Sequence, residues 1–88
     1  MKFKTLLVSK EHWFAIGIEE ESGRHYISIP MCNRLVDYGE YYEISNEDFE
    51  MYYRDLSLAL GFVEACKAQE NDHLLFLQPG SDRGVPRG

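Results

Sequence analysis

The sequence lacks an excess of basic residues, since its nine Lys and Arg stand against fifteen Asp and Glu and give a net charge of −6. Nucleic acids and anionic membranes are bound by clusters of Lys and Arg, so neither is an expected partner. Apolar runs are also short, and none approaches the ~20 residues that cross a bilayer. With 44% apolar residues, however, the chain is too hydrophobic for a disordered acidic protein. These absences leave one small folded domain, and any partner steered to it by charge should be basic.

Cysteine is scarce, and the spacing of Cys32 and Cys66 excludes a CxxC motif. No signal-peptide pattern precedes the first strand pattern, so we expect a cytoplasmic protein with two free thiols. The histidines, His12, His25 and His73, lack the spacing of metal ligands. We therefore predict neither a metal site nor a cofactor.

Catalytic motifs are absent from the chain. Cys32 follows Pro30 in a predicted loop, and with His25 it could form a thiolate pair for nucleophilic catalysis. Such a site also needs a positioned base and an oxyanion site, and the spacing identifies neither. We predict no catalytic residue and no enzymatic activity, and an enzyme that uses His25 and Cys32 is the third-ranked alternative.

Alternating apolar residues predict three antiparallel strands, over residues 2–9, 12–18 and 24–29. In the second and third strands, the alternating apolar residues should face the core. They are Phe14, Ile16, Ile18, Ile27 and Ile29. Pro30 cannot donate to a sheet ladder, so we expect it to end the third strand.

The second half of the chain should be mainly helical. A short strand over 41–44 is followed by Ser45 as a helix N-cap, and Asp55 is a second N-cap before an apolar stripe that runs to about residue 69. An apolar run over 73–77 predicts a last buried strand.

These elements predict an α+β fold, with a mostly antiparallel sheet of four to five strands and the helices packed on one face. The chain order is three strands, an optional fourth, two helices and a last strand. Residues 1–78 should form a single domain. Residues 79–88 hold one core-forming residue, Val85, and we expect them to form a flexible tail.

Charge and tyrosine gather in one window. Residues 37–55 contain seven acids, one base and five of the six tyrosines, so this window carries the whole net charge. Tyrosine gives large contact area with a polar tip, and carboxylates steer a basic protein and pair with its Arg and Lys. The predicted partner-binding residues are Asp37, Tyr38, Glu40, Tyr41, Tyr42, Glu43, Glu47, Glu50 and Tyr53.

Part of this pattern has a simpler explanation. Glu47, Asp48 and Glu50 lie in the first turns of a predicted helix, where negative charge stabilises the helix dipole without any partner. The stretch 37–43 gains nothing from a helix dipole, and its alternation of Tyr with Glu favours an interface.

In size, charge and surface composition, the chain resembles the immunity proteins and antitoxins with which bacteria neutralise toxins, many of them basic nucleases. The resemblance rests on no sequence motif, so it implies a function but assigns no functional residue. It implies a protein that binds a basic toxin domain and inhibits it.

The alternative is a structural or regulatory subunit that forms a homodimer, through a sheet edge or through the face that carries Trp13. Trp13, Ala15, Tyr26 and Ser28 should lie on the sheet face away from the helices. That face is a candidate for a second contact surface.

Overall fold

The structure is a computed structural model of the chain, and it describes residues 1–80 and 82–87. Four strands form an antiparallel sheet in chain order, and a short fifth strand pairs with the third. The elements are β1 (Phe3–Ser9), β2 (Phe14–Glu19), β3 (His25–Cys32), β4 (Asp37–Ile44), α1 (Asn46–Arg54), α2 (Leu60–Lys67) and β5 (Val85–Pro86), with single 3₁₀ turns at Leu56–Ala59 and Asp72–Leu74.

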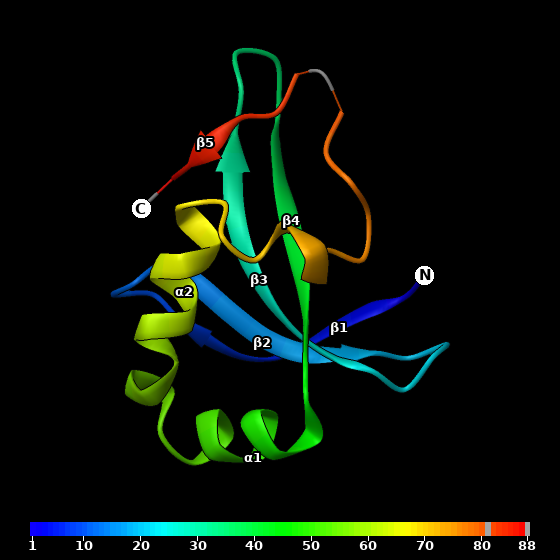
Figure 1. Ribbon diagram of the computed structural model, residues 1–88, viewed down its shortest axis with the longest axis vertical. Helices are drawn as coiled ribbons and strands as arrows, with labels where there is room; N and C mark the ends of the chain where they lie inside the picture. Colours follow the sequence, from blue (N-terminus) through cyan, green and yellow to red (C-terminus); the bar gives the residue numbers. More distant parts are fainter. Residues whose placement is uncertain (81, 88) are drawn as a thin grey trace.

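Both helices lie together on one side of the sheet, with α2 beside β3 and α1 at the bottom of the view (Figure 1). This arrangement confirms the predicted α+β fold with a mostly antiparallel sheet. No helix in the described residues is both long and apolar enough to cross a membrane.

The main core lies between the helices and the sheet. Phe14, Ile16, Ile27 and Ile29 are all buried there, as their alternation predicts, and Val63 of α2 packs against them. Ile18, predicted with them, is only half-buried near the end of β2 and does not belong to this core. Burying one such side chain stabilises the fold by about 1.5–3 kcal/mol, so this layer is the main source of stability.

Pro30 does not end the third strand, and that prediction is wrong. β3 continues to Cys32 and pairs with β4 throughout, with Pro30 opposite Gly39. The Pro30 carbonyl accepts a hydrogen bond from the Arg87 amide (3.0 Å). The nitrogen and the carbonyl of one strand residue point to the same side, so the Pro30 nitrogen also faces away from β4. The missing N–H therefore removes no hydrogen bond of the β3–β4 ladder. Leu35 lies at the hairpin tip and is exposed.

Both predicted helix caps are confirmed. The Ser45 hydroxyl accepts a hydrogen bond from the Asp48 amide (3.0 Å) at the start of α1. The Asp55 carboxylate accepts one from the Ser57 amide (3.0 Å) and begins the 3₁₀ turn that leads into α2. Capping side chains satisfy amides that have no partner inside the helix, which explains why these local signals identify the helix starts.

The predicted strand over 73–77 is wrong. Residues Asp72–Leu74 form a 3₁₀ turn, and Leu75 makes only an isolated bridge to Tyr42. The run is apolar because it passes the edge of β4: Leu75 enters the main core, while the Phe76 ring meets the Phe3 ring edge-on, 5.4 Å between centroids. Side chains that are buried alternately on the two sides of the sheet edge are all apolar, so the segment looks like a buried strand although it forms none.

The other face of the sheet is covered in part by its own aromatic side chains. Tyr26 is fully buried with its ring edge-on to those of Phe3 and Tyr41, and its hydroxyl lies 3.1 Å from the Thr5 hydroxyl. Phe3 and Tyr41 come from strands three apart, yet their rings stack with centroids 3.9 Å apart. The sheet is therefore strongly curled, with its concave side away from the helices.

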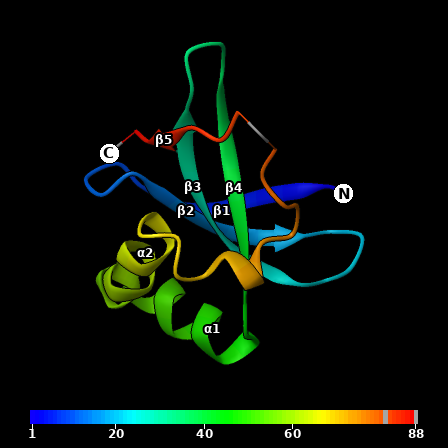
Figure 2. The same ribbon diagram turned by 45° about the horizontal axis from the view of Figure 1, so that its top comes forward.

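The described part of residues 79–88 is attached to the sheet. β5 pairs with Met31 and Cys32 of β3, and Figure 2 shows it beside β3, toward the tip of the hairpin. The Gly84 amide donates a hydrogen bond to the Tyr38 hydroxyl oxygen (2.7 Å). Ser81 and Gly88 lie outside the described residues, and flexibility of this segment stays a prediction.

Candidate functional site

The acids that precede α1 are paired with arginines from distant parts of the chain. Arg24 donates to Glu43 (3.1 Å), Arg83 donates to Glu40, and Arg87 pairs with Asp37. The stretch 37–43 was the half of the window that favoured an interface. Its carboxylates have intramolecular partners, so a binding partner is not needed to explain them.

Glu40 and Arg83 form the most buried of these pairs. The guanidinium meets both carboxylate oxygens of Glu40 (2.8 and 3.0 Å) and both of Asp72 (2.8 and 2.9 Å). Tyr42 donates its hydroxyl proton to Glu40 at 2.7 Å, and burial raises the pKa of that hydroxyl well above its usual range. The hydrogen bonds from Arg83 lower the pKa of Asp72. This cluster fastens the C-terminal segment to β4.

The alternation of β4 divides the predicted tyrosines and acids between two faces of the sheet. Tyr42 belongs to the main core, and Tyr38 packs against it. Tyr41 lies on the opposite face, against Phe3. The predicted residues of β4 therefore do not form one surface, and Glu40 and Tyr42 are buried.

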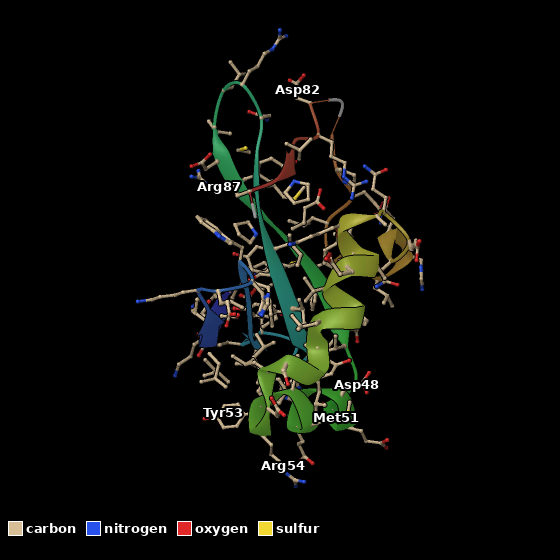
Figure 3. The ribbon with its side chains drawn as sticks, turned by 90° about the vertical axis from the view of Figure 1, so that its left-hand side faces the viewer. Asp48, Met51, Tyr53, Arg54, Asp82 and Arg87 are labelled. Atoms are coloured by element: carbon tan, nitrogen blue, oxygen red, sulfur yellow. The ribbon has the colours of Figure 1, made fainter. Side chains whose placement is uncertain are left out.

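Within the acidic window, helix α1 carries three acids that have no ion pair in the described part of the chain. Glu47, Asp48 and Glu50 take part in no salt bridge there, and the only base of the helix is Arg54. Figure 3 shows Asp48, Met51, Tyr53 and Arg54 around α1 at one end of the molecule, with Asp82 and Arg87 at the other end. The unpaired acids of the window, apart from Asp55 at the end of the helix, are thus grouped on α1.

Exposed apolar side chains lie beside these acids. Met51 and Tyr53 of α1 are 41% and 52% exposed, and Leu6 of β1 is 40% exposed. Leu6 occupies the β-bulge between Thr5 and Leu7. A hollow of about 360 Å³ separates β1 from α1 and is lined by Leu6, Phe49, Glu50, Tyr53 and Arg54. We call this hollow, together with Glu47 and Met51, the α1 surface.

His25 and Cys32 lie too far apart in the sheet to act as a catalytic pair. The two residues lie seven positions apart on one extended strand, a separation of about 23 Å. His25 instead stacks on Phe49 (4.0 Å) and forms a hydrogen bond with Asn46 (2.7 Å). Cys32 and Cys66 are free thiols, as predicted, and burial raises the pKa of Cys66 to about 11. In the described residues, no three His, Cys, Asp or Glu side chains are grouped to hold a metal ion.

Comparison with known proteins gave no match. No family model matches the chain, and no curated protein or solved structure is significantly similar to it.

Of the nine predicted interface residues, Glu47, Glu50 and Tyr53 belong to the α1 surface. The apolar part of that surface, Leu6 and Met51, was missed. Leu6 is more than forty residues away in sequence from the α1 residues that line the hollow, and only the packing of β1 beside α1 brings it close. Met51 lies within the acidic window, and its place between Glu50 and Tyr52 in a polar helix was the one available signal.

Proposed function

We propose that the protein binds and neutralises a basic protein partner, as immunity proteins and antitoxins do, and that it uses the α1 surface. The observation that carries the proposal is the position of unpaired acids beside exposed Leu6, Met51 and Tyr53. A solvated helix start explains the acids alone, but it does not explain three large apolar side chains next to them.

This combination suits a fast and selective complex. Carboxylates without internal partners attract a basic surface and raise the association rate. Tyrosine and methionine then supply contact area, and truncating a buried aromatic anchor typically costs about 2 kcal/mol of binding free energy. A nuclease is one partner of this kind, since a groove that binds phosphates is basic.

The proposed interface is narrower than the sequence predicts. Glu47, Glu50 and Tyr53 stay in it. Glu40 and Tyr42 are left out because they are buried, and Asp37, Tyr38, Tyr41 and Glu43 are left out because they lie elsewhere and contact other parts of the chain.

A charge-reversal pair tests the proposal. Tagged protein is used to capture partners from cells that carry the gene, at low and high salt, and captured proteins are tested for a toxic activity that the wild type suppresses. We expect one basic protein whose retention falls with salt. Glu47→Lys with Glu50→Lys should lose this protein and its suppression.

Glu64→Lys with Glu70→Lys is the matched control, because both acids are exposed, lie outside the α1 surface and give the same change in net charge. The control should retain the partner. Equal losses in both double variants would show that net charge, and not the α1 surface, controls binding. A stable homodimer in sedimentation, with no basic protein captured, would favour the structural-subunit alternative and overturn the proposal.

A further inference from the structure

A cleft of about 450 Å³ lies on the concave face of the sheet, on the side away from the helices. The strand register builds it: Val8 pairs with Ala15, Ala15 with Ser28, and Ser28 with Tyr41, so one row crosses all four strands. The next pair on the same face of β3 and β4 is Pro30 with Gly39. The middle of the row is small, while Val8, Trp13 and Tyr41 stand at its sides.

The walls of the cleft are fixed in place. Tyr41 stacks on Phe3, and its ring passes 3.1 Å from the position that a Cβ on Gly39 would occupy. Trp13 is held with a φ of 56°, a backbone conformation that is uncommon for a bulky residue, and is 44% exposed. The Arg87 guanidinium lies 5.5 Å from the centroid of the Trp13 ring. A rigid aromatic cleft needs little reorganisation to bind a ligand.

We propose that this cleft binds an extended proline-rich peptide segment that carries a carboxylate beside its prolines. The floor strands β2 and β3 are each paired on both sides, so a peptide cannot bind here by adding a strand. Recognition must use side chains. Proline-rich segments dock in aromatic-lined grooves of this kind, because their extended helix is already ordered before binding.

The polar groups of the cleft fit such a segment. Trp13, Ser28 and Tyr41 each carry a hydrogen-bond donor, and none of the three has a side-chain hydrogen-bond partner within residues 1–80 and 82–87. A polyproline helix has no internal hydrogen bonds, so its carbonyls are open to such donors.

Charge selects an acidic peptide. Among the residues that line the cleft, Lys10 is the charged one. Its positive charge attracts a carboxylate at this place, although the protein as a whole carries a net charge of −6. The occupant therefore differs in charge from the basic partner proposed for the α1 surface, and each proposal can fail without the other.

Trp13 provides the readout because it is the single tryptophan of the chain. Its fluorescence is titrated with two synthetic peptides of consecutive prolines, both amidated at the C-terminus, one ending in glutamate and the other in lysine. We expect a saturable change with the glutamate peptide and about fivefold weaker binding of the lysine peptide. Lys10→Glu should reverse this preference, whereas Lys4→Glu, which makes the same change in charge outside the cleft, should leave it unchanged.

Ser28→Tyr fills the floor of the cleft and should abolish binding while the far-UV circular dichroism stays that of the wild type. Three results overturn the proposal: no saturation with either peptide below about 1 mM, equal binding by wild type and Ser28→Tyr, or a fluorescence change with protein concentration alone that accompanies dimer formation. Binding of a small aromatic acid such as indole acetate in place of both peptides also overturns it, in favour of a small-molecule site.

Discussion

Glu19 closes the turn between β2 and β3 by accepting backbone hydrogen bonds. Its carboxylate receives the amides of Lys2 (2.8 Å), Ser22 (2.8 Å) and Glu21 (3.0 Å), and only 1% of the residue is exposed. These hydrogen bonds, that from Lys2 first, lower the pKa of Glu19 from 4.5 to about 2. The charged form is thus an integral part of the fold.

Replacing the Glu19 carboxylate should change how the free energy of unfolding depends on pH. The pKa of Glu19 is lower in the folded protein, so its contribution is complete above pH 4.5 and is lost as pH falls toward about 2. Glu19→Gln should be less stable than wild type at pH 7 and show a shallower fall in stability between these pH values, measured by urea unfolding. Glu20→Gln, at the exposed neighbouring position, should follow the wild-type profile. Parallel profiles for wild type and Glu19→Gln would refute the role of the carboxylate.

Gly17 and Gly61 should respond to alanine in opposite ways. A Cβ on Gly17 would lie 2.1 Å from the Lys4 carbonyl oxygen and 2.6 Å from the Tyr26 hydroxyl oxygen, so β1 would have to move. Gly17→Ala should destabilise the fold by about 2–3 kcal/mol. A Cβ on Gly61, inside α2, meets nothing within 4 Å, and Gly61→Ala should stabilise the fold by up to about 1 kcal/mol. Thermal unfolding of both variants checks the prediction, and equal small effects would contradict the close approach of β1 to β2.

At the scale of the element, the C-terminal segment is fastened to β4 by Arg83. The side chain of Glu40 is 5% exposed and that of Arg83 is 15% exposed. Removing one partner of a buried ion pair leaves the other charge buried and uncompensated, at a cost of about 3–5 kcal/mol. We expect Arg83→Met to destabilise the protein by about 3 kcal/mol in urea unfolding.

A second substitution separates the ion pair from simple loss of packing. Adding Glu40→Gln to Arg83→Met removes the uncompensated charge and should regain part of the lost stability. The cost of the double variant should therefore be smaller than the sum of the two single costs. Additive costs would show that the two side chains are not coupled.

The elements that the sequence predicted correctly depend on residues close together in the chain. Alternation in β2 and β3 and the caps Ser45 and Asp55 are examples, because a strand face or a helix start is determined within a few positions. The errors depend on distant neighbours. Whether Pro30 ends a strand depends on which neighbouring strand its nitrogen faces. The run over 73–77 is apolar because its side chains pack on both sides of β4.

The candidate site was predicted in part for the same reason. Glu47 and Glu50 in the first turns of α1 stay exposed, as a helix pattern indicates. Asp37, Glu40 and Glu43 are paired with arginines that lie 50, 43 and 19 positions away in the chain. Charge counted in a sequence window cannot detect partners at such separations.

At the scale of the whole molecule, one sheet supports two packed layers. The helices cover one face, and the rings of Phe3, Tyr26 and Tyr41 cover part of the other. Neighbouring residues of β3 serve both layers, since Ile27 is buried toward the helices and Tyr26 toward the aromatic rings. Because both layers pack against the same strand, loss of packing in one layer should disorder β3 and with it the other layer.

The two layers should therefore unfold together. Trp13 fluorescence reports on the concave face, and far-UV circular dichroism reports on the helices of the opposite face. In urea, the two signals should give the same midpoint and slope, as a two-state transition requires. Tyr26→Ala removes a fully buried ring from the concave side only. It should lower the free energy of unfolding by about 3–5 kcal/mol, and the urea midpoints of both signals should fall by the same amount. A Trp13 transition that precedes the loss of helix, in wild type or variant, would mean that the concave layer unfolds separately, and the cleft would then lack the rigidity on which peptide binding depends.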